Sequence, residues 1–178
     1  MISARIKEKA RHIRLLALDV DGVLTDGRLY FAEDGSELKT FDTQDGHGIK
    51  MLQKAGIDVV IITGRTTQLV AKRAQNLGIT HLLQGREDKL VALREICAEQ
   101  GIDLDEAAYV GDDWPDLPAI LACGLGIAVS NAHTELRGRA DHVTTLAGGR
   151  GAVREVCDLI LQAQDHYEDA LAPYLEIN

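Results

Sequence analysis

Two aspartates, two positions apart in the sequence, follow an apolar segment near the start of the chain. Residues 15–18 predict a buried strand, and Asp19 and Asp21 come directly after it, followed by Gly22. Side chains alternate along a strand, but here the chain leaves the sheet, so both carboxylates can turn toward one point. Like charges at the end of a buried strand need a cation or a proton nearby. We expect Mg²⁺, which prefers oxygen ligands and would attract an anionic substrate.

A second acidic segment follows another predicted strand. Residues 107–110 are apolar and lead into Gly-Asp-Asp-Trp-Pro-Asp at 111–116. Between the two acidic segments, the apolar residues 59–62 end in Thr-Gly-Arg at 63–65, and Lys89 opens a helical stretch. Ligands of open parallel sheets bind outside the carboxyl ends of the strands. The sequence therefore predicts one site with carboxylates, a hydroxyl, free backbone N–H groups and a lysine, which suits phosphoryl transfer.

Alternating strand and helix signals predict a parallel sheet built by crossover connections. Strands are expected at 14–19, 58–63, 107–111, 126–129 and 141–144. Helices are expected at about 46–55, 66–77, 87–100, 115–122 and 150–163, with a short one within 1–14. A chain of 178 residues suits a single domain, so we expect one over 1–178.

Residues 28–42 interrupt this alternation. Asp34-Gly35 lies there between two β-rich segments, which is a strong hairpin signal. With these two residues at the centre of the turn, Phe31 is expected opposite Leu38. Two strands alone are marginal in water. The hairpin is therefore expected to fold back on its own domain or, as we favour, to contact other subunits through its apolar face.

Composition excludes several kinds of partner. The net charge of −9 argues against nucleic acid, which requires a basic face. No apolar run approaches the length of a membrane span, and the basic residues 1–14 lack the apolar stretch of a signal peptide. Cys97, Cys123 and Cys157 are odd in number and widely spaced, which predicts buried free thiols and a cytoplasmic location.

The four motifs, in this order, resemble those of the haloacid dehalogenase superfamily of aspartyl phosphotransferases. They are Asp-x-Asp-Gly-Val-Leu-Thr at 19–25, Thr-Gly at 63–64, Lys89, and Gly-Asp-Asp-x-x-Asp at 111–116. The resemblance implies a Rossmann-like α/β fold, with helices on both faces of a parallel sheet. It also implies that the hairpin 28–42 stands where larger relatives carry a cap domain.

Five longer motifs support a closer similarity within the superfamily. They are Asp-Gly-His-Gly-Ile-Lys at 45–50, Ile-Ile-Thr-Gly-Arg at 61–65, Leu-Gly-Ile-Thr-His-Leu at 77–82, Gly-Asp-Asp-x-x-Asp-Leu-Pro at 111–118 and Gly-Gly-Arg-Gly-Ala-Val-Arg-Glu at 148–155. With these motifs the chain is similar to the phosphatases of 3-deoxy-D-manno-octulosonate 8-phosphate (KDO 8-phosphate). This similarity covers roughly residues 12–163. It implies release of inorganic phosphate from KDO 8-phosphate, a step toward Gram-negative lipopolysaccharide, and a homotetramer whose hairpins partly roof neighbouring active sites.

The acidic residues are assigned as follows. Asp19 is the predicted nucleophile, which forms an aspartyl-phosphate that water hydrolyses. Asp21 is the predicted acid and base for the departing oxygen and the incoming water. Asp19 and Asp112 are expected to bind the metal, and the resemblance adds the backbone carbonyl of Asp21. Asp113 binds the metal, directly or through water, or caps a helix. Asp116 is expected behind these ligands, orienting a lysine or the metal waters.

The remaining candidates are the groups that bind the substrate. Thr63 and the Gly64 N–H are expected to hold phosphate oxygens, and Lys89 adds positive charge there. Arg65 is a candidate for a substrate carboxylate. In the resembled family an arginine here favours the eight-carbon substrate, whereas phosphatases of nine-carbon sugar acids carry lysine. The alternative is a surface arginine. Arg150 is an anion-binding candidate at a helix start or a solvated loop charge.

Several alternatives compete with this assignment. A receiver domain also gathers acids, a threonine and a lysine around magnesium, but its acceptor aspartate lies on a mid-chain strand and lacks a following acid. A non-catalytic assembly module of the same fold would not need all the motif residues. A phosphatase of a nine-carbon sugar acid is the strongest competitor. Gln44, where many relatives have arginine, and the acidic tail 164–178 are departures whose effect stays open.

Overall fold

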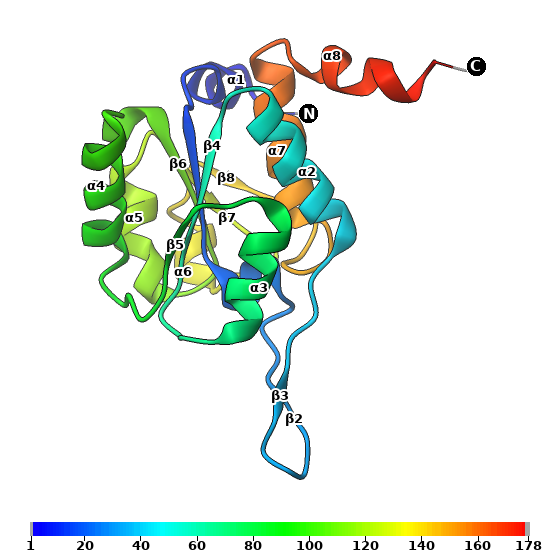
Figure 1. Cartoon of the computed structure of the whole chain (residues 1–178). Coiled ribbons are helices and arrows are strands. Elements are labelled where there is room, and N and C mark those ends of the chain that lie inside the picture. The colour runs from blue at the N-terminus through cyan, green and yellow to red at the C-terminus, as the bar shows by residue number, and fades with distance from the viewer. Residues whose placement is uncertain (1, 177–178) are drawn as a thin grey trace.

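A six-stranded parallel sheet forms the centre of the molecule (Figure 1). The computed structural model describes residues 2–176; Met1 and the end of the predicted tail, 177–178, lie outside them. The strand order is β5-β4-β1-β6-β7-β8, and every neighbouring pair is parallel, which confirms the predicted fold class. The strands are β1 (Leu15–Leu18), β4 (Asp58–Ile62), β5 (His81–Leu83), β6 (Ala107–Gly111), β7 (Leu125–Ala128) and β8 (His142–Val143).

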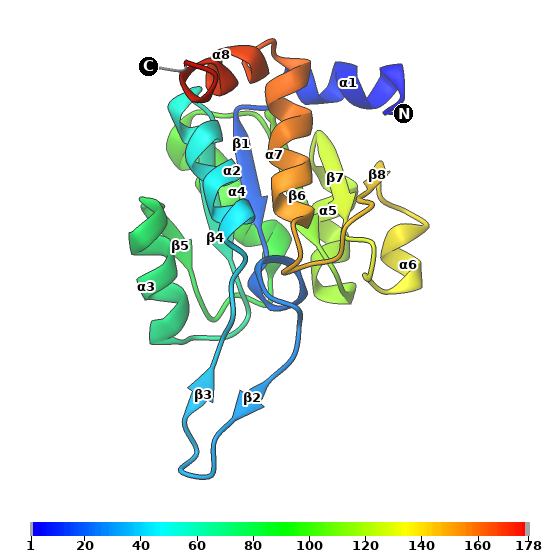
Figure 2. The same ribbon diagram turned by 90° about the vertical axis from the view of Figure 1, so that its right-hand side faces the viewer.

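Helices cover both faces of this sheet. α2 and α7 pack together on one face, with α1 against α7, and α4 and α5 lie on the other (Figures 1 and 2). The helices are α1 (Ala4–Arg11), α2 (Thr43–Lys54), α3 (Gln68–Leu77), α4 (Lys89–Gln100), α5 (Leu117–Ala122), α6 (Thr134–Arg137), α7 (Ala152–Ala163) and α8 (Tyr167–Leu171). Short 3₁₀ turns occupy Leu104–Glu106, Trp114–Asp116 and Ala172–Tyr174.

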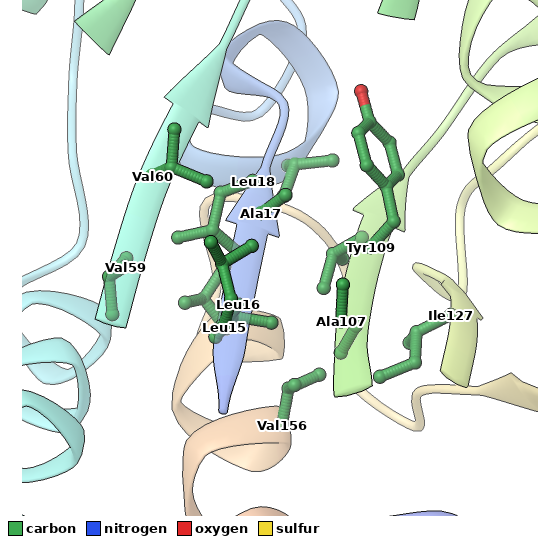
Figure 3. Close-up of a cluster of buried hydrophobic side chains, with 14 of the residues drawn as sticks. Leu15, Leu16, Ala17, Leu18, Val59, Val60, Ala107, Tyr109, Ile127 and Val156 are labelled. Carbon is green, nitrogen blue, oxygen red and sulfur yellow. The ribbon is translucent and has the colours of Figure 1, made fainter. Parts of the chain in front are cut away.

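The core is made by aliphatic side chains of the central strands (Figure 3). All four residues of β1 are buried because helices cover both of its faces. Burial of a leucine side chain contributes about 1.5–3 kcal/mol. Tyr109 is the exception among these residues, because its ring is fully buried but its hydroxyl points toward the carboxyl ends of the strands. A buried phenol needs a polar partner at that end.

Several element boundaries differ from the predictions. The edge strand β5 was not predicted, because its three residues are only partly buried and carry little periodic signal. α2 begins at Thr43 rather than at 46, since Asp42 caps it by accepting the N–H groups of Gln44 and Asp45. α7 begins at 152 rather than at 150, because Gly151 has a left-handed φ of 96°. The short helices α6 and α8 were also missed.

The hairpin extends away from the sheet at the end where the strands finish (Figures 1 and 2). It consists of β2 (Tyr30–Phe31) and β3 (Glu37–Leu38), paired antiparallel. The predicted hairpin is therefore confirmed, but its register was wrong. Phe31 lies opposite Glu37, not opposite Leu38.

The turn of the hairpin explains the shifted register. The N–H of Ala32 donates to the carbonyl of Ser36 at 2.9 Å, so three residues lie between these two. Gly35 closes the turn with a φ of 81°. A three-residue loop that ends in a left-handed glycine moves the pairing by one residue relative to a two-residue turn.

The tail lies at the other end of the molecule. α8 and the described end of the chain are on the side of the sheet opposite the hairpin (Figures 1 and 2). The described part of the tail therefore lies far from the carboxyl ends of the strands of the same chain. Among residues 2–176, no helix combines the length and the apolar character that crossing a membrane requires.

Candidate active site

The carboxyl ends of β1, β4 and β6 surround one cavity of about 200 Å³. The four sequence motifs meet here, because neighbouring parallel strands finish at the same edge of the sheet. The cavity is lined by Asp19, Asp21, Thr63, Gly64, Arg65, Glu87, Lys89, Asp112, Asp113, Pro115 and Asp116. Nine of the ten residues predicted for the site are in this set, and Arg150 is not.

Lys89 connects the first acidic segment to the second. Its Nζ donates to Asp19 Oδ1 at 2.6 Å and to the carbonyl of Ile62 at 2.9 Å, and lies 3.3 Å from Asp116 Oδ1. Its side chain is only 4% exposed. Burial lowers the pKa of this ammonium, but the charges of Asp19 and Asp116 outweigh it, so the net shift is upward. Lys89 is therefore a fixed positive charge beside the predicted nucleophile.

Asp116 supports the site through hydrogen bonds with the loop after β6 and with Tyr109. Its Oδ2 accepts the N–H groups of Asp112 and Asp113 at 3.0 and 3.3 Å, and its Oδ1 accepts the hydroxyl of Tyr109 at 2.8 Å. Both oxygens are thus engaged by donors of the chain. Asp116 thus holds the loop after β6 and lies 3.3 Å from the Lys89 ammonium, whereas Asp19 and Asp112 are the other two carboxylates of the cluster. Tyr109 was not predicted, although a tyrosine within an apolar strand was a signal.

The acidic cluster fits a divalent cation. Asp19, Asp112 and Asp116 each offer an oxygen, and these oxygens lie within 4.8 Å of one another. Burial and the charge of Asp116 raise the pKa of Asp19 to about 7. Burial, followed by the charges of Asp19 and Asp116, raises the pKa of Asp112 to about 8. Such crowded carboxylates are stabilised in their ionised form by a hard cation with oxygen ligands.

Gly22 allows this close approach. It has a φ of 94°, and a Cβ built on it would lie 2.0 Å from Asp112 Oδ2. Any side chain here would displace the carboxylate of the second motif from the loop of the first. The glycine of the first motif is therefore required by the second, which lies about 90 residues further along the chain.

Asp21 has a different partner from Asp19. Its carboxylate pairs with the ammonium of Lys39, which comes from the chain just after β3. Lys39 also lies 3.4 Å from Glu37 Oε1. Neither hairpin residue was predicted for the site. The available signal was the alternation in this strand, where Glu37 and Lys39 share one face and Leu38 points to the other.

The β4 end provides the groups predicted to bind phosphate. Thr63 is buried, but its N–H donates to the carbonyl of Leu83 at 2.9 Å, so only its hydroxyl is available. The Gly64 N–H has no acceptor among residues 2–176. Arg65 lines the cavity, and its guanidinium donates to Glu37 Oε2 at 2.9 Å. A substrate carboxylate would have to share or replace that contact.

The side chains of two predicted site residues, Asp113 and Arg150, do not join the acidic cluster of Asp19, Asp112 and Asp116. Asp113 accepts the N–H of Trp114 at 2.8 Å and caps the 3₁₀ turn that follows, which is the capping alternative. Arg150 is exposed, outside the cavity lining, and its charge acts on Asp26. The structure therefore does not bring Arg150 to the predicted anion site.

Comparisons with known proteins agree with this geometry. The family of haloacid dehalogenase-like hydrolases matches residues 79–155. The 3-deoxy-D-manno-octulosonate 8-phosphate phosphatase KdsC of Escherichia coli (strain K12) is 51% identical over 169 residues, which cover 95% of this chain and 90% of the relative. KdsC of Yersinia pestis is 52% identical over 163 residues, which cover 92% of this chain and 87% of the relative.

Solved structures are equally similar. A probable YrbI family phosphatase from Pseudomonas syringae pv. phaseolica 1448a matches with a TM-score of 0.97 and 53% identity, over 99% of this chain and 100% of the other. The KDO 8-phosphate phosphatase of Moraxella catarrhalis, solved with magnesium, phosphate and KDO, matches with a TM-score of 0.95 and 46% identity, over 97% and 99% of the two chains. The chain belongs to the KDO 8-phosphate phosphatase family of haloacid dehalogenase-like hydrolases.

Proposed function

We propose that this protein is a magnesium-dependent phosphomonoesterase that hydrolyses KDO 8-phosphate to KDO and inorganic phosphate. The observation that carries the proposal is the position of Asp19, buried at the end of β1, held by Lys89 and next to the carboxylate of Asp112. The membership of the chain in the KDO 8-phosphate phosphatase family supports the substrate. The reaction would be a step toward the sugar acid of lipopolysaccharide, in the cytoplasm.

In the first half of the reaction, Asp19 displaces the sugar. One carboxylate oxygen of Asp19 bonds to phosphorus, the bond from phosphorus to the ester oxygen breaks, and Asp21 gives that oxygen its proton. The carboxylates of Asp19 and Asp112 and the backbone carbonyl of Asp21 would hold Mg²⁺, whose charge would offset the repulsion between the carboxylate and the phosphate. Lys89, the Thr63 hydroxyl and the Gly64 N–H stabilise the phosphate oxygens.

In the second half, water releases the phosphate. Asp21, now a carboxylate, takes a proton from the water that attacks the aspartyl-phosphate. The bond between phosphorus and Asp19 breaks, inorganic phosphate forms, and Asp21 is protonated again. The same residue thus serves both steps, which explains why an acid two positions after the nucleophile is needed.

The sugar end of the substrate is assigned to Arg65. Its planar guanidinium can bind a carboxylate through two parallel hydrogen bonds, and it lines the cavity. Its contact with Glu37 in this structure supports the same preference, because Glu37 is itself a carboxylate. The nine-carbon sugar-acid phosphates are the alternative substrates.

The hairpin is proposed to join copies of a single 1–178 domain into a homotetramer. Leu29, Phe31 and Leu38 are 52%, 65% and 61% exposed in the isolated chain. Large apolar side chains exposed on the two faces of a two-stranded ribbon favour burial against other subunits. Sedimentation velocity of the wild type and of Phe31→Ser would test this, since loss of the most exposed apolar side chain of the ribbon should shift the protein toward smaller species.

Initial rates on a panel of phosphate esters test the substrate. The panel holds KDO 8-phosphate, a nine-carbon sugar-acid phosphate, a neutral sugar phosphate and p-nitrophenyl phosphate, each with Mg²⁺ and with EDTA. We expect KDO 8-phosphate to have the highest kcat/KM and EDTA to abolish every rate. Equal rates across the panel would contradict the substrate assignment, and rates unchanged by EDTA would contradict the metal.

Arg65→Lys sharpens this test. The variant keeps the charge but loses the bidentate geometry, so kcat/KM for KDO 8-phosphate should fall about tenfold or more. The rate on p-nitrophenyl phosphate, which has no carboxylate, should change little. Equal losses on both substrates would contradict the specificity role of Arg65.

A further inference from the structure

The hairpin contributes one cation, the Lys39 ammonium, to the active site. Lys39 lies just after β3, on a ribbon whose other side chains are mostly exposed, yet its own side chain is only 1% exposed. Its Nζ contacts a single oxygen of Asp21, namely Oδ1. Among the described residues, Asp21 has no other charged partner within ion-pair distance.

Two further residues hold Lys39 in this position. Glu37, on the same face of the hairpin strand, places Oε1 3.4 Å from the Lys39 Nζ. The other oxygen of Glu37 accepts a hydrogen bond from Arg65 at 2.9 Å. Asp21, Lys39, Glu37 and Arg65 therefore form a row of alternating charges. The row joins the loop after β1, the hairpin and the end of β4.

A buried ammonium of this kind differs from a solvated charge at the surface. A lysine has a flexible four-carbon side chain, and fixing and desolvating its ammonium costs free energy that only close partners offset. The same site already holds a second buried lysine, Lys89, which pairs with Asp19. Each of the two aspartates in the first motif thus has its own lysine, one from the domain and one from the hairpin.

We propose that Lys39 is a positioning residue for Asp21. Its ammonium holds one oxygen of the carboxyl group, which leaves the other oxygen for the ester oxygen of the substrate. This inference rests on the proposed function, in which Asp21 is the acid that assists departure of the sugar.

The step in which Lys39 acts can be written in full. The bond between Asp19 and phosphorus forms, and the bond between phosphorus and the ester oxygen breaks with its electron pair on that oxygen. The oxygen takes the proton of Asp21, whose Oδ1 is the oxygen held by Lys39, and the Lys39 ammonium keeps its own protons. A sugar alkoxide is strongly basic and needs this proton, whereas p-nitrophenolate leaves without one.

Lys39→Met tests the inference, because methionine keeps most of the length and apolar contact of lysine. On KDO 8-phosphate we expect kcat to fall about 100-fold, near the lower end of what a general acid contributes. On p-nitrophenyl phosphate we expect a loss of less than about threefold. KM should change less than about threefold on either substrate, because Lys39 does not hold the substrate. Lys39→Arg should recover part of the lost kcat on the sugar phosphate.

Matched variants separate position from charge. Lys50→Met removes an exposed lysine of α2 and should leave both activities unchanged. Glu37→Gln removes the charge that holds Lys39 and should lower kcat selectively on the sugar phosphate, by less than Lys39→Met does. Glu37→Gln also provides the test if Lys39→Met fails to give a folded protein by circular dichroism.

The outcomes that overturn the inference are distinct from failure of the proposed function. Equal losses on both esters would make Lys39 a structural residue, and a raised KM with unchanged kcat would make it a substrate-binding residue. Either result overturns the inference and leaves the phosphatase standing. A wild-type protein that hydrolyses neither ester with Mg²⁺ would overturn the proposed function together with the inference.

Discussion

The two aspartates of the first motif lie two residues apart, yet they are held by different parts of the molecule. The Asp19 side chain is 10% exposed and pairs with Lys89, which extends from α4 within the folded domain. The Asp21 side chain is 24% exposed and pairs with Lys39, which the hairpin supplies. The ribbon that carries Lys39 has only two paired residues in each strand.

This difference assigns the two halves of the chemistry to two structural units. The groups proposed to attack and bind phosphorus are positioned by the sheet and its helices, and their geometry is as stable as the core. The group proposed to assist the leaving sugar depends on a ribbon that has no core of its own. Changes in the domain should therefore affect all substrates, whereas changes in the hairpin should affect mainly substrates with a poor leaving group.

The largest predicted effect is that of Asp19→Asn. An amide cannot form the phosphoryl bond, so phosphate release should fall by on the order of 10⁴-fold or more on both KDO 8-phosphate and p-nitrophenyl phosphate. In Asp21→Asn, phosphate release should fall by about 10²–10⁴-fold on the sugar phosphate and much less on the aryl ester. Measurement of inorganic phosphate at saturating Mg²⁺ checks both. Equal losses of activity by Asp21→Asn on the two esters would contradict the proposed difference in role between Asp19 and Asp21.

The second prediction compares the stability roles of the two lysines. Lys89→Met removes a buried cation between Asp19 and Asp116, so the free energy of unfolding should fall by about 2–4 kcal/mol. Lys39→Met removes a buried cation whose partner Asp21 is still partly exposed to water, so the loss should be smaller, about 1–2 kcal/mol. Urea unfolding of both variants at pH 7 measures the difference. Equal losses would mean that the hairpin is as much a part of the folded unit as α4.

The third prediction concerns Asp45, which anchors the helix that follows the hairpin. It is 1% exposed, its Oδ1 accepts the N–H of Arg154 at 2.8 Å, and its Oδ2 has no partner within the described part of the chain. Burial, with a contribution from the charge of Asp42, raises the pKa of Asp45 from 3.8 to about 6. A carboxyl group shifted upward stabilises the fold fully below pH 3.8, and this stabilisation is lost as the pH rises through about 6.

Asp45→Asn should therefore change the pH dependence of stability. Asparagine keeps the acceptor for Arg154 but carries no charge, so above pH 7 the variant should be more stable than the wild type by about 1–3 kcal/mol. At pH 4 the difference should vanish or reverse. Urea unfolding between pH 4 and pH 8 gives the comparison. A constant difference across that range would show that the charge of Asp45 is not what limits stability.

The smallest predicted effect is that of Tyr109→Phe. The variant keeps the buried ring and removes the hydroxyl that donates to Asp116 at 2.8 Å, so stability should fall by about 1 kcal/mol. Because Asp116 still accepts two backbone N–H groups, the site should keep its shape, and phosphate release should fall only a few-fold on both esters. A loss confined to the sugar phosphate would link the domain side of the site to Asp21 and break the division proposed above.

Much of the catalytic half of the site was predictable, because its residues follow apolar strands directly. Asp19, Thr63 and Asp112 each come at the end of such a strand, and parallel strands end at one edge. Asp116 lies with Asp19 and Asp112 in one cluster of carboxylates, and its role as a residue that orients the others stays a prediction. Arg150 lies exposed and outside the cavity lining, as in the alternative of a solvated loop charge, since a cation among glycines at a helix start can point to the solvent as well as to an anion.

The sequence alone determined the features that depend on short-range patterns: the parallel sheet, the hairpin and the four motifs at the strand ends. Only the tertiary structure decided which lysine meets which aspartate, how the hairpin is registered and that Glu37 joins Arg65 to Lys39. These contacts connect residues up to 70 positions apart. They depend on the length of the hairpin turn and on the direction in which the hairpin leaves the sheet. The local periodicity of the sequence predicts neither.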